Sequence, residues 1–155
     1  MSTNRAGEAL PRVSYVIGRL DRALRRELDH RLADLGLSWP EYTAMSILYR
    51  TSGLSNAQLA RRSYVAPQTM LEVIARLEEA GYIERRPSPS HRRILETRLT
   101  ERGLVELEAC DRAVDEMEQE MLAEVPESAR ALLLAQLVGC VRALHAGFAE
   151  RESAI

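Results

Sequence analysis

The stretch LSNAQLARRSYVAPQTMLEVIARLEEAG, residues 54–81, carries the pattern of two short helices joined by a turn. Ser55 and Gln58 form a capping box, which indicates the start of the first helix. Pro67 begins the second helix, because a proline in the first turn gives up no backbone hydrogen bond, and Gly81 ends it. Apolar residues recur at steps of three and four through the second helix, at Met70, Val73, Ile74 and Leu77. This order of elements predicts a helix-turn-helix.

A β-hairpin is predicted directly after these two helices. Residues 82–86 are typical of a short strand, and residues 94–99 alternate like a returning strand. Between them, the segment Pro-Ser-Pro-Ser at 87–90 is typical of a turn. The helix-turn-helix and this hairpin together predict a winged helix-turn-helix.

Four more helices are predicted around this unit. One covers about residues 10–35 and ends at Gly36, and the next runs from a capping box at 38–41 to about Tyr49. A third runs from Thr100, its N-cap, to about Ala123, and Pro126 opens the last. The first and last helices carry apolar stripes, at Leu10, Val13, Ile17, Leu20, Leu24, Leu28, Leu32 and Leu35, and at Leu133, Leu134, Leu137, Val138, Val141, Leu144 and Phe148.

One helix cannot bury such a stripe alone, so we expect the two terminal helices to pack together, and across a two-fold axis, in a homodimer. The expected fold is mainly α with a small β-hairpin. In it, a winged helix-turn-helix DNA-binding lobe (residues 37–103) lies between an N-terminal dimerisation helix (1–36) and C-terminal dimerisation helices (104–155).

Composition excludes several classes of function. No apolar run approaches the roughly 20 residues of a membrane span, and residues 1–7 lack the apolar segment of a secretory signal, so we expect a cytoplasmic protein with no membrane partner. The chain has no Gly-rich phosphate loop, GxSxG or HExxH motif, which argues against an enzyme. Its three histidines have no partners at metal-ligand spacing, so no metal or other cofactor is expected.

Charge is unevenly distributed, although the net charge is only −2. Between residues 84 and 102 there are six arginines against three acids, whereas residues 104–124 hold eight acids and one arginine. All 21 basic residues are arginine, which can contact phosphates bidentately and fit narrow grooves. A basic patch beside an acidic helix fits a duplex DNA partner.

The second helix of a helix-turn-helix enters the major groove with its N-terminal end. There Gln68 can contact adenine bidentately, Thr69 can contact a phosphate or a base, and Met70 can contact a thymine methyl. Arg92 and Arg93 in the hairpin loop suit a narrow minor groove. The candidate DNA-binding residues are Ser55, Pro67, Gln68, Thr69, Met70, Glu72, Arg76, Ser90, His91, Arg92 and Arg93.

The sequence resembles the MarR family of winged helix-turn-helix transcriptional regulators across nearly its whole length. The resemblance rests on residues 54–60, on 67–69 continuing through 77–85, and on Arg92-Arg93 followed by 99–103. It implies a homodimeric regulator, expected to be a repressor, that binds a pseudo-palindromic operator. It also implies release from DNA by a small aromatic or phenolic ligand that binds between the two lobes.

Three positions depart from the family pattern: Ser88 and His91 in the wing, and Glu72 in the second helix. The wing commonly reads Asp-Pro-x-Asp-Arg-Arg, whereas residues 88–93 here are Ser-Pro-Ser-His-Arg-Arg, so His91 replaces an acid that braces the wing arginine. Glu72 stands where a basic or neutral residue is common. Its carboxylate would either repel phosphate or select a cytosine N4 donor.

The candidate ligand cleft is lined by Tyr15, Arg19, Trp39, Tyr42 and Met45. Trp39 and Tyr42 are alternatively interpreted as core aromatics that brace the two lobes, and Tyr15 with Arg19 as a surface pair. Two alternative functions stay open: a helical dimeric adaptor without DNA binding, and a redox-responsive regulator. For the latter, the acids around Cys110 should raise its pKa and oppose its reactivity.

Overall fold

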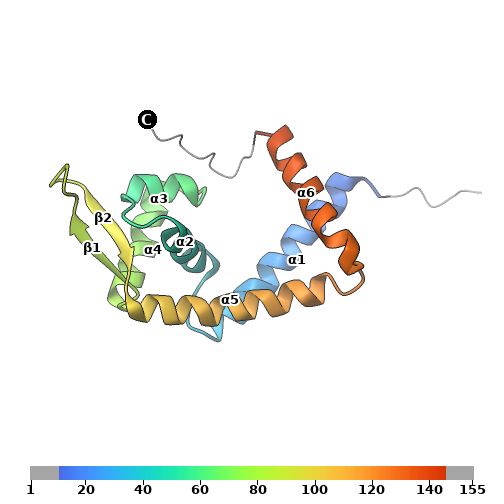
Figure 1. Cartoon of the computed structure of the whole chain (residues 1–155), viewed down its shortest axis with the longest axis horizontal. Coiled ribbons are helices and arrows are strands. Elements are labelled where there is room, and N and C mark those ends of the chain that lie inside the picture. Colours follow the sequence, from blue (N-terminus) through green and yellow to red (C-terminus); the bar gives the residue numbers. More distant parts are fainter. Residues whose placement is uncertain (1–10, 146–155) are drawn as a thin grey trace, which may run out of the picture.

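The computed structural model describes residues 11–145 and contains six helices and one hairpin within that range (Figure 1). In chain order the elements are α1 (Val13–Ala33), α2 (Trp39–Arg50), α3 (Asn56–Arg62), α4 (Pro67–Glu79), β1 (Ile83–Pro87), β2 (Leu95–Leu99), α5 (Glu101–Met121) and α6 (Glu127–Ala143). The predicted order of helices and strands is therefore confirmed, with ends that differ by a few residues. Leu10 and Phe148, which were assigned to the terminal stripes, lie outside the described residues.

Three helices begin at the caps that the sequence predicted. At α2 the Ser38 backbone N–H donates to Glu41 Oε2 at 2.7 Å. At α3 the Ser55 N–H donates to Gln58 Oε1 at 2.9 Å, and the Gln58 N–H donates to Ser55 Oγ at 3.2 Å. At α5 the Gly103 N–H donates to Thr100 Oγ1 at 3.0 Å. Each bond satisfies a donor that the first helical turn leaves unpaired.

One hydrophobic core holds the helix-turn-helix, the hairpin and the adjoining parts of α1 and α5 together. Its fully buried side chains come from all of these elements and include Leu32, Met45, Leu48, Leu59, Met70, Ile74, Leu77 and Cys110. Because α1 and α5 both contribute, the helix-turn-helix and the hairpin are packed directly onto the two long helices. A shift of either helix would be transmitted to α4 through side-chain packing.

The hairpin is antiparallel and pairs Ile83 with Leu99 at its base and Pro87 with Leu95 near its tip. Leu54, from the loop between α2 and α3, forms an isolated bridge with Thr97 on the other edge of β2. The hairpin is thus attached to the helix-turn-helix, and its loop extends away from the helices (Figure 1).

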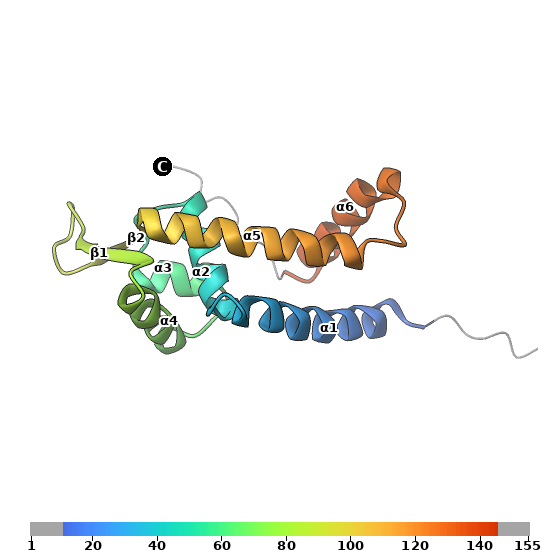
Figure 2. The same ribbon diagram turned by 90° about the horizontal axis from the view of Figure 1, so that it is seen from below.

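The long helices are arranged differently from the sequence-based expectation. Within one chain α1 packs against α5, not against α6, and Arg31 Nη2 of α1 lies 2.6 Å from Glu120 Oε2 of α5. Helix α6 overlaps α1 in Figure 1 but is separated from it in Figure 2. No residue of α6 is buried, so its leucine-rich stripe has no partner within the described part of the chain. The expected packing of α1 on α6 within a chain is wrong, because the acidic helix α5 occupies that side of α1.

Candidate nucleic-acid interface

The N-terminal end of α4 presents polar side chains outward. Pro67 occupies the first turn, and Pro67, Gln68 and Thr69 are all exposed. The α3 helix supports this end, because Asn56 Nδ2 donates to the Pro67 carbonyl at 3.3 Å. An exposed amide and hydroxyl at the start of a helix can hydrogen-bond to base edges or to phosphates.

Met70 does not belong to this surface. Its exposed fraction is 0%, and it packs in the core with Ile74 and Leu77. The expectation that Met70 contacts a thymine methyl is therefore wrong. It shares the buried stripe of α4, which faces away from the polar residues.

Leu71 is an exposed apolar residue on α4 that sequence reasoning missed. Its exposed fraction is 41%, and it lies one turn before Ala75, which is also exposed. The sequence does indicate this exposure, because Leu71 lies outside the apolar stripe formed by Met70, Val73, Ile74 and Leu77. An exposed leucine beside polar residues offers an apolar contact for a thymine methyl.

Two charged candidates of α4 have different surroundings. Glu72 is exposed. Arg76 is also largely exposed, but its Nη1 lies 3.6 Å from Glu41 Oε1 of α2, whose side chain is only 7% exposed. Arg76 therefore partly compensates a buried acid at the start of α2, and it links α2 to α4.

The base of the wing is braced by a serine and not by the acid of the family pattern. Ser88 is buried, its Oγ lies 3.1 Å from Ser90 Oγ, and its backbone N–H donates to the Ile94 carbonyl at 2.8 Å. Hydrogen bonds from Ser88 and from Arg98 lower the pKa of Glu96 on β2. These contacts hold the two ends of the wing loop together, so the replacement of the acid by His91 leaves the loop closed.

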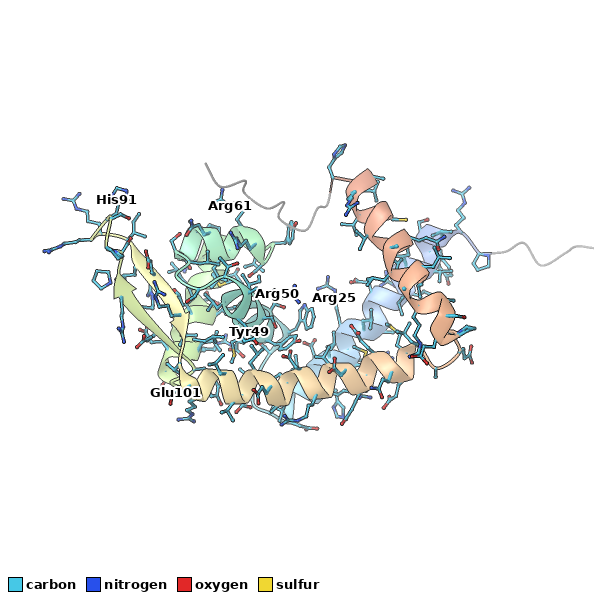
Figure 3. All side chains as sticks on the ribbon, viewed as in Figure 1. Arg25, Tyr49, Arg50, Arg61, His91 and Glu101 are labelled. Carbon is cyan, nitrogen blue, oxygen red and sulfur yellow. The ribbon has the colours of Figure 1, made fainter. Side chains whose placement is uncertain are left out.

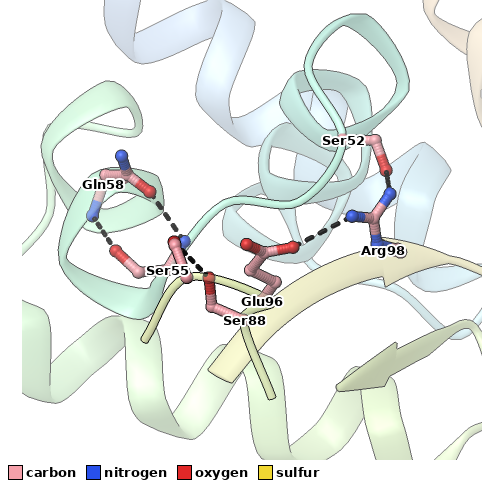
Figure 4. Close-up of polar contacts among 7 residues, drawn as sticks. Ser52, Ser55, Gln58, Ser88, Glu96 and Arg98 are labelled. Atoms are coloured by element: carbon pink, nitrogen blue, oxygen red, sulfur yellow. Dashed lines mark hydrogen bonds and ion pairs between the residues drawn. The ribbon is translucent and has the colours of Figure 1, made fainter. Parts of the chain in front are cut away.

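Arg98 connects the wing to the helix-turn-helix. Its Nη2 lies 2.9 Å from Glu96 Oε2, and its Nη1 donates to Ser52 Oγ at 3.4 Å (Figure 4). Arg98 is therefore engaged in fixing the wing and is less available to DNA than the loop arginines.

The tip of the wing carries the remaining candidates. Ser90, His91, Arg92 and Arg93 are all exposed, and Figure 3 places His91 at the far end of the hairpin. Neither Arg92 nor Arg93 forms an ion pair with any residue between 11 and 145. Unpaired guanidinium groups on a projecting loop are suited to phosphates or to a narrow minor groove. Ser55, in contrast, has its hydroxyl engaged as the cap of α3.

The structure does not assemble the predicted five-residue ligand cleft within one chain. Met45 is fully buried in the core and lines no cleft. Tyr15 and Arg19 are exposed near the far end of α1, where the Arg19 guanidinium lies 5.9 Å from the centre of the Tyr15 ring. From Tyr15 to the end of α1 the helix rises by roughly 27 Å, so this surface pair is remote from Trp39.

Trp39 and Tyr42 do lie together. Their ring centres are 5.6 Å apart, and both are partly buried against the core. The Tyr42 hydroxyl donates to Asp111 Oδ1 of α5 at 2.7 Å, and burial together with this carboxylate raises the pKa of Tyr42. These contacts join α2 to α5, as expected for core aromatics that brace the two lobes.

The described residues offer little support for redox sensing, metal binding or a membrane span. Cys110 is fully buried, and burial, with the charges of Glu106 and Asp111, raises its pKa to about 11. A thiol in this state is a poor nucleophile, which argues against redox sensing at Cys110. Residues 11–145 contain no group of three or more potential metal ligands and no helix long and apolar enough to cross a membrane.

The second helix of the helix-turn-helix presents an exposed polar end, and a β-hairpin projects beside it. This arrangement defines a winged helix-turn-helix protein. The model of the MarR family matches residues 37–95, which cover α2 through the start of β2. The chain belongs to the MarR family. This membership places it among transcriptional regulators, not among enzymes.

Two transcriptional regulators with similar sequences agree with this assignment. The transcriptional repressor Rv2887 of Mycobacterium tuberculosis is 41% identical over 91 residues, which span 59% of this chain and 66% of that repressor. The transcriptional regulator MT0903.1 of the same species is 31% identical over 110 residues, 71% of this chain and 77% of the regulator.

Solved structures of Rv2887 share the fold. Its complex with DNA superposes with a TM-score of 0.72 at 30% identity, covering 82% of this chain and 95% of that one. Its complex with salicylic acid gives a TM-score of 0.68 at 32% identity, covering 84% and 96%.

Proposed function

We propose that the chain is a homodimeric transcriptional repressor that binds a pseudo-palindromic operator and is released by a small aromatic acid. The observation that carries the proposal is an exposed polar face on α4 beside two wing arginines that form no ion pair within residues 11–145. The related repressor Rv2887, which was solved with DNA, supports this use of the fold. In the proposed complex α4 lies in the major groove and Arg92 and Arg93 contact the flanking minor groove or backbone.

The salt dependence of binding tests the DNA interface. Fluorescence anisotropy with the duplex upstream of the protein's own gene should show log K falling linearly with log salt. Arg92→Ala should weaken binding to all duplexes alike and reduce the slope by about 1. Arg112→Ala, which removes the same charge from the exposed acidic side of α5, is the matched control and should leave the slope unchanged. Equal slopes for both variants would remove the wing from the interface, and a protein that binds no duplex would favour the adaptor alternative.

The unpartnered apolar surfaces support the homodimer. Val13, Tyr15, Val16, Ile17 and Leu20 of α1 and Leu132, Leu134, Leu137 and Leu144 at α6 are exposed. A groove of about 240 Å³ between α1 and α5, lined in part by Leu20, Leu24, Met117 and Met121, continues this surface. Burial of these side chains in an interface above roughly 2,000 Å² would make an obligate dimer. Light scattering that shows a monomer at micromolar concentration would contradict this.

Trp39 and Tyr42 are the proposed effector contacts. The pair is aromatic and partly buried at the junction of α2 and α5, and the relative Rv2887 was solved with salicylic acid. Because Trp39 is the sole tryptophan, its fluorescence reports on this site directly. Titration of salicylate into the protein–operator complex should change Trp39 emission and lower operator affinity by about 5- to 150-fold. A change in emission without release would mean that the site binds but does not switch, and no change would leave the aromatics purely structural.

A further inference from the structure

Glu72 carries a negative charge without a counter-charge in the middle of the outward face of α4. Its side chain is exposed, and it forms no ion pair with any residue between 11 and 145. Gln68 lies one turn before it on the same face of the helix, opposite the buried stripe that contains Met70. Glu72 therefore occupies the surface that the proposed function directs toward the bases.

A basic partner for Glu72 is within reach but is engaged elsewhere. A glutamate followed four residues later by an arginine is the favourable orientation for an ion pair along a helix, and Arg76 stands at that position. Arg76 instead approaches Glu41, at 3.6 Å, on the neighbouring helix α2. Because Glu41 is buried, its charge has the greater need of compensation. Glu72 is left facing outward, where its carboxylate oxygens can accept hydrogen bonds.

The edges of the four bases differ in how they receive such an acceptor. In the major groove guanine presents two acceptors and thymine presents one, so both repel a carboxylate. Adenine presents a donor next to an acceptor, a pattern that matches an amide such as Gln68 better than a carboxylate. Cytosine presents the N4 amino group alone, as a donor. Among the bases, cytosine is therefore the one that best satisfies Glu72.

We propose that Glu72 is a specificity-determining residue that accepts a hydrogen bond from the N4 amino group of one cytosine in each half of the operator. This inference rests on the proposed function, in which α4 enters the major groove. Gln68 and Glu72 differ in height by about 6 Å along the helix, which corresponds to about two base-pair steps. The cytosine is thus expected within about two base pairs of the adenine that Gln68 contacts.

Selection from random duplexes tests the assignment. Wild-type protein should enrich one cytosine per half-site, with affinity about 5- to 100-fold higher than for thymine at that position. Glu72→Ala should lose this preference, and Glu72→Gln should shift it toward adenine, because an amide pairs with adenine. Glu78→Gln is the matched control: it removes the same charge from an exposed position about 120° around α4. The Glu78→Gln variant should keep the preference for cytosine.

Three results would overturn the inference, and they are distinguishable. If Glu72→Ala keeps the cytosine preference, another residue contacts that base. If Glu72→Ala tightens binding to every duplex by one factor, as Glu78→Gln does, Glu72 acts only by general repulsion of phosphates. If the wild type binds no duplex, the inference fails together with the proposed function, whereas in the first two cases the proposed function stands. Thermal unfolding should be nearly unchanged in all three variants, since both glutamates are exposed.

Discussion

Replacement of Gly103 by alanine tests a close backbone contact between the start of α5 and the start of the hairpin. Gly103 lies in the first turn of α5, directly against Tyr82 at the start of the hairpin. A Cβ atom at this position would lie 2.0 Å from the Tyr82 carbonyl oxygen and 2.9 Å from its carbonyl carbon. The obstructing atoms belong to the backbone, so no side-chain rotation can remove the clash.

The size of the effect follows from the contacts that must separate. An ordinary van der Waals contact begins at about 3.4 Å, so α5 would have to retreat from Tyr82 by roughly 1.4 Å. That movement breaks the bond from the Thr100 N–H to the Tyr82 carbonyl, now 3.0 Å, and the bond from Thr100 Oγ1 to the Gly81 carbonyl, now 2.7 Å. Overpacking and the loss of two hydrogen bonds should together lower the free energy of unfolding by about 2–6 kcal/mol.

Urea unfolding followed by circular dichroism measures this loss. Gly18→Ala is the matched control, because a Cβ at Gly18 in α1 meets no atom within 4 Å. There alanine should stabilise the helix by about 0.5–1 kcal/mol, since glycine is unfavourable inside helices. All proteins should be compared at one concentration, because dimer stability depends on it. A Gly103→Ala protein within about 0.5 kcal/mol of wild type would refute the tight contact between α5 and the wing.

Three further outcomes follow from the burial of particular side chains. Met70→Ala should lower the free energy of unfolding by about 2–5 kcal/mol, because it empties a core position, and it should leave the base preference unchanged. An altered base preference would show that Met70 contacts DNA. At pH 8 a Cys140→Ala protein, in which Cys110 is the one remaining thiol, should react with a thiol reagent only after unfolding, and reaction of the native protein would contradict the burial of Cys110. The free energy of unfolding should fall as pH rises from about 9 toward 11, because the raised pKa of Cys110 makes the folded state hold its proton longer than the unfolded state does. In a series of urea titrations across this range, Cys110→Ala should weaken the decline, and an unchanged decline would exclude Cys110 as a source.

Local signals predicted the elements well because each depends on residues close together in the chain. The caps at Ser38, Ser55 and Thr100 involve partners three residues away, and all three are formed. Met70 shows how a correct local signal can be overruled. Its spacing from Val73 and Leu77 placed it in the core, but the expectation that the start of α4 contacts bases assigned it to DNA.

Contacts between different helices could not be predicted from the sequence pattern. The approach of Arg76 to Glu41 depends on how α4 packs against α2, and the Tyr42–Asp111 bond depends on how α2 packs against α5. The structure does not bring Tyr15 and Trp39 together within one chain for a related reason, because shared chemical character does not make residues meet when most of a 21-residue helix separates them.

The distribution of charge over the interface separates the affinity for DNA from its base preference. Among its charged residues α4 has three glutamates and one arginine, and that arginine is engaged with Glu41. The tip of the wing holds Arg92 and Arg93 without partners among the described residues. Release of counterions, and with it the dependence on salt, should therefore arise mainly from the wing, whereas the proposed hydrogen bonds from α4 to the bases should be screened little by salt. Raising the salt concentration should weaken binding to an operator and to the same duplex with its cytosine replaced by thymine in parallel, so that the ratio of the two affinities stays constant. A ratio that falls toward 1 together with the affinity would show that charge, and not the bases facing α4, provides the selectivity.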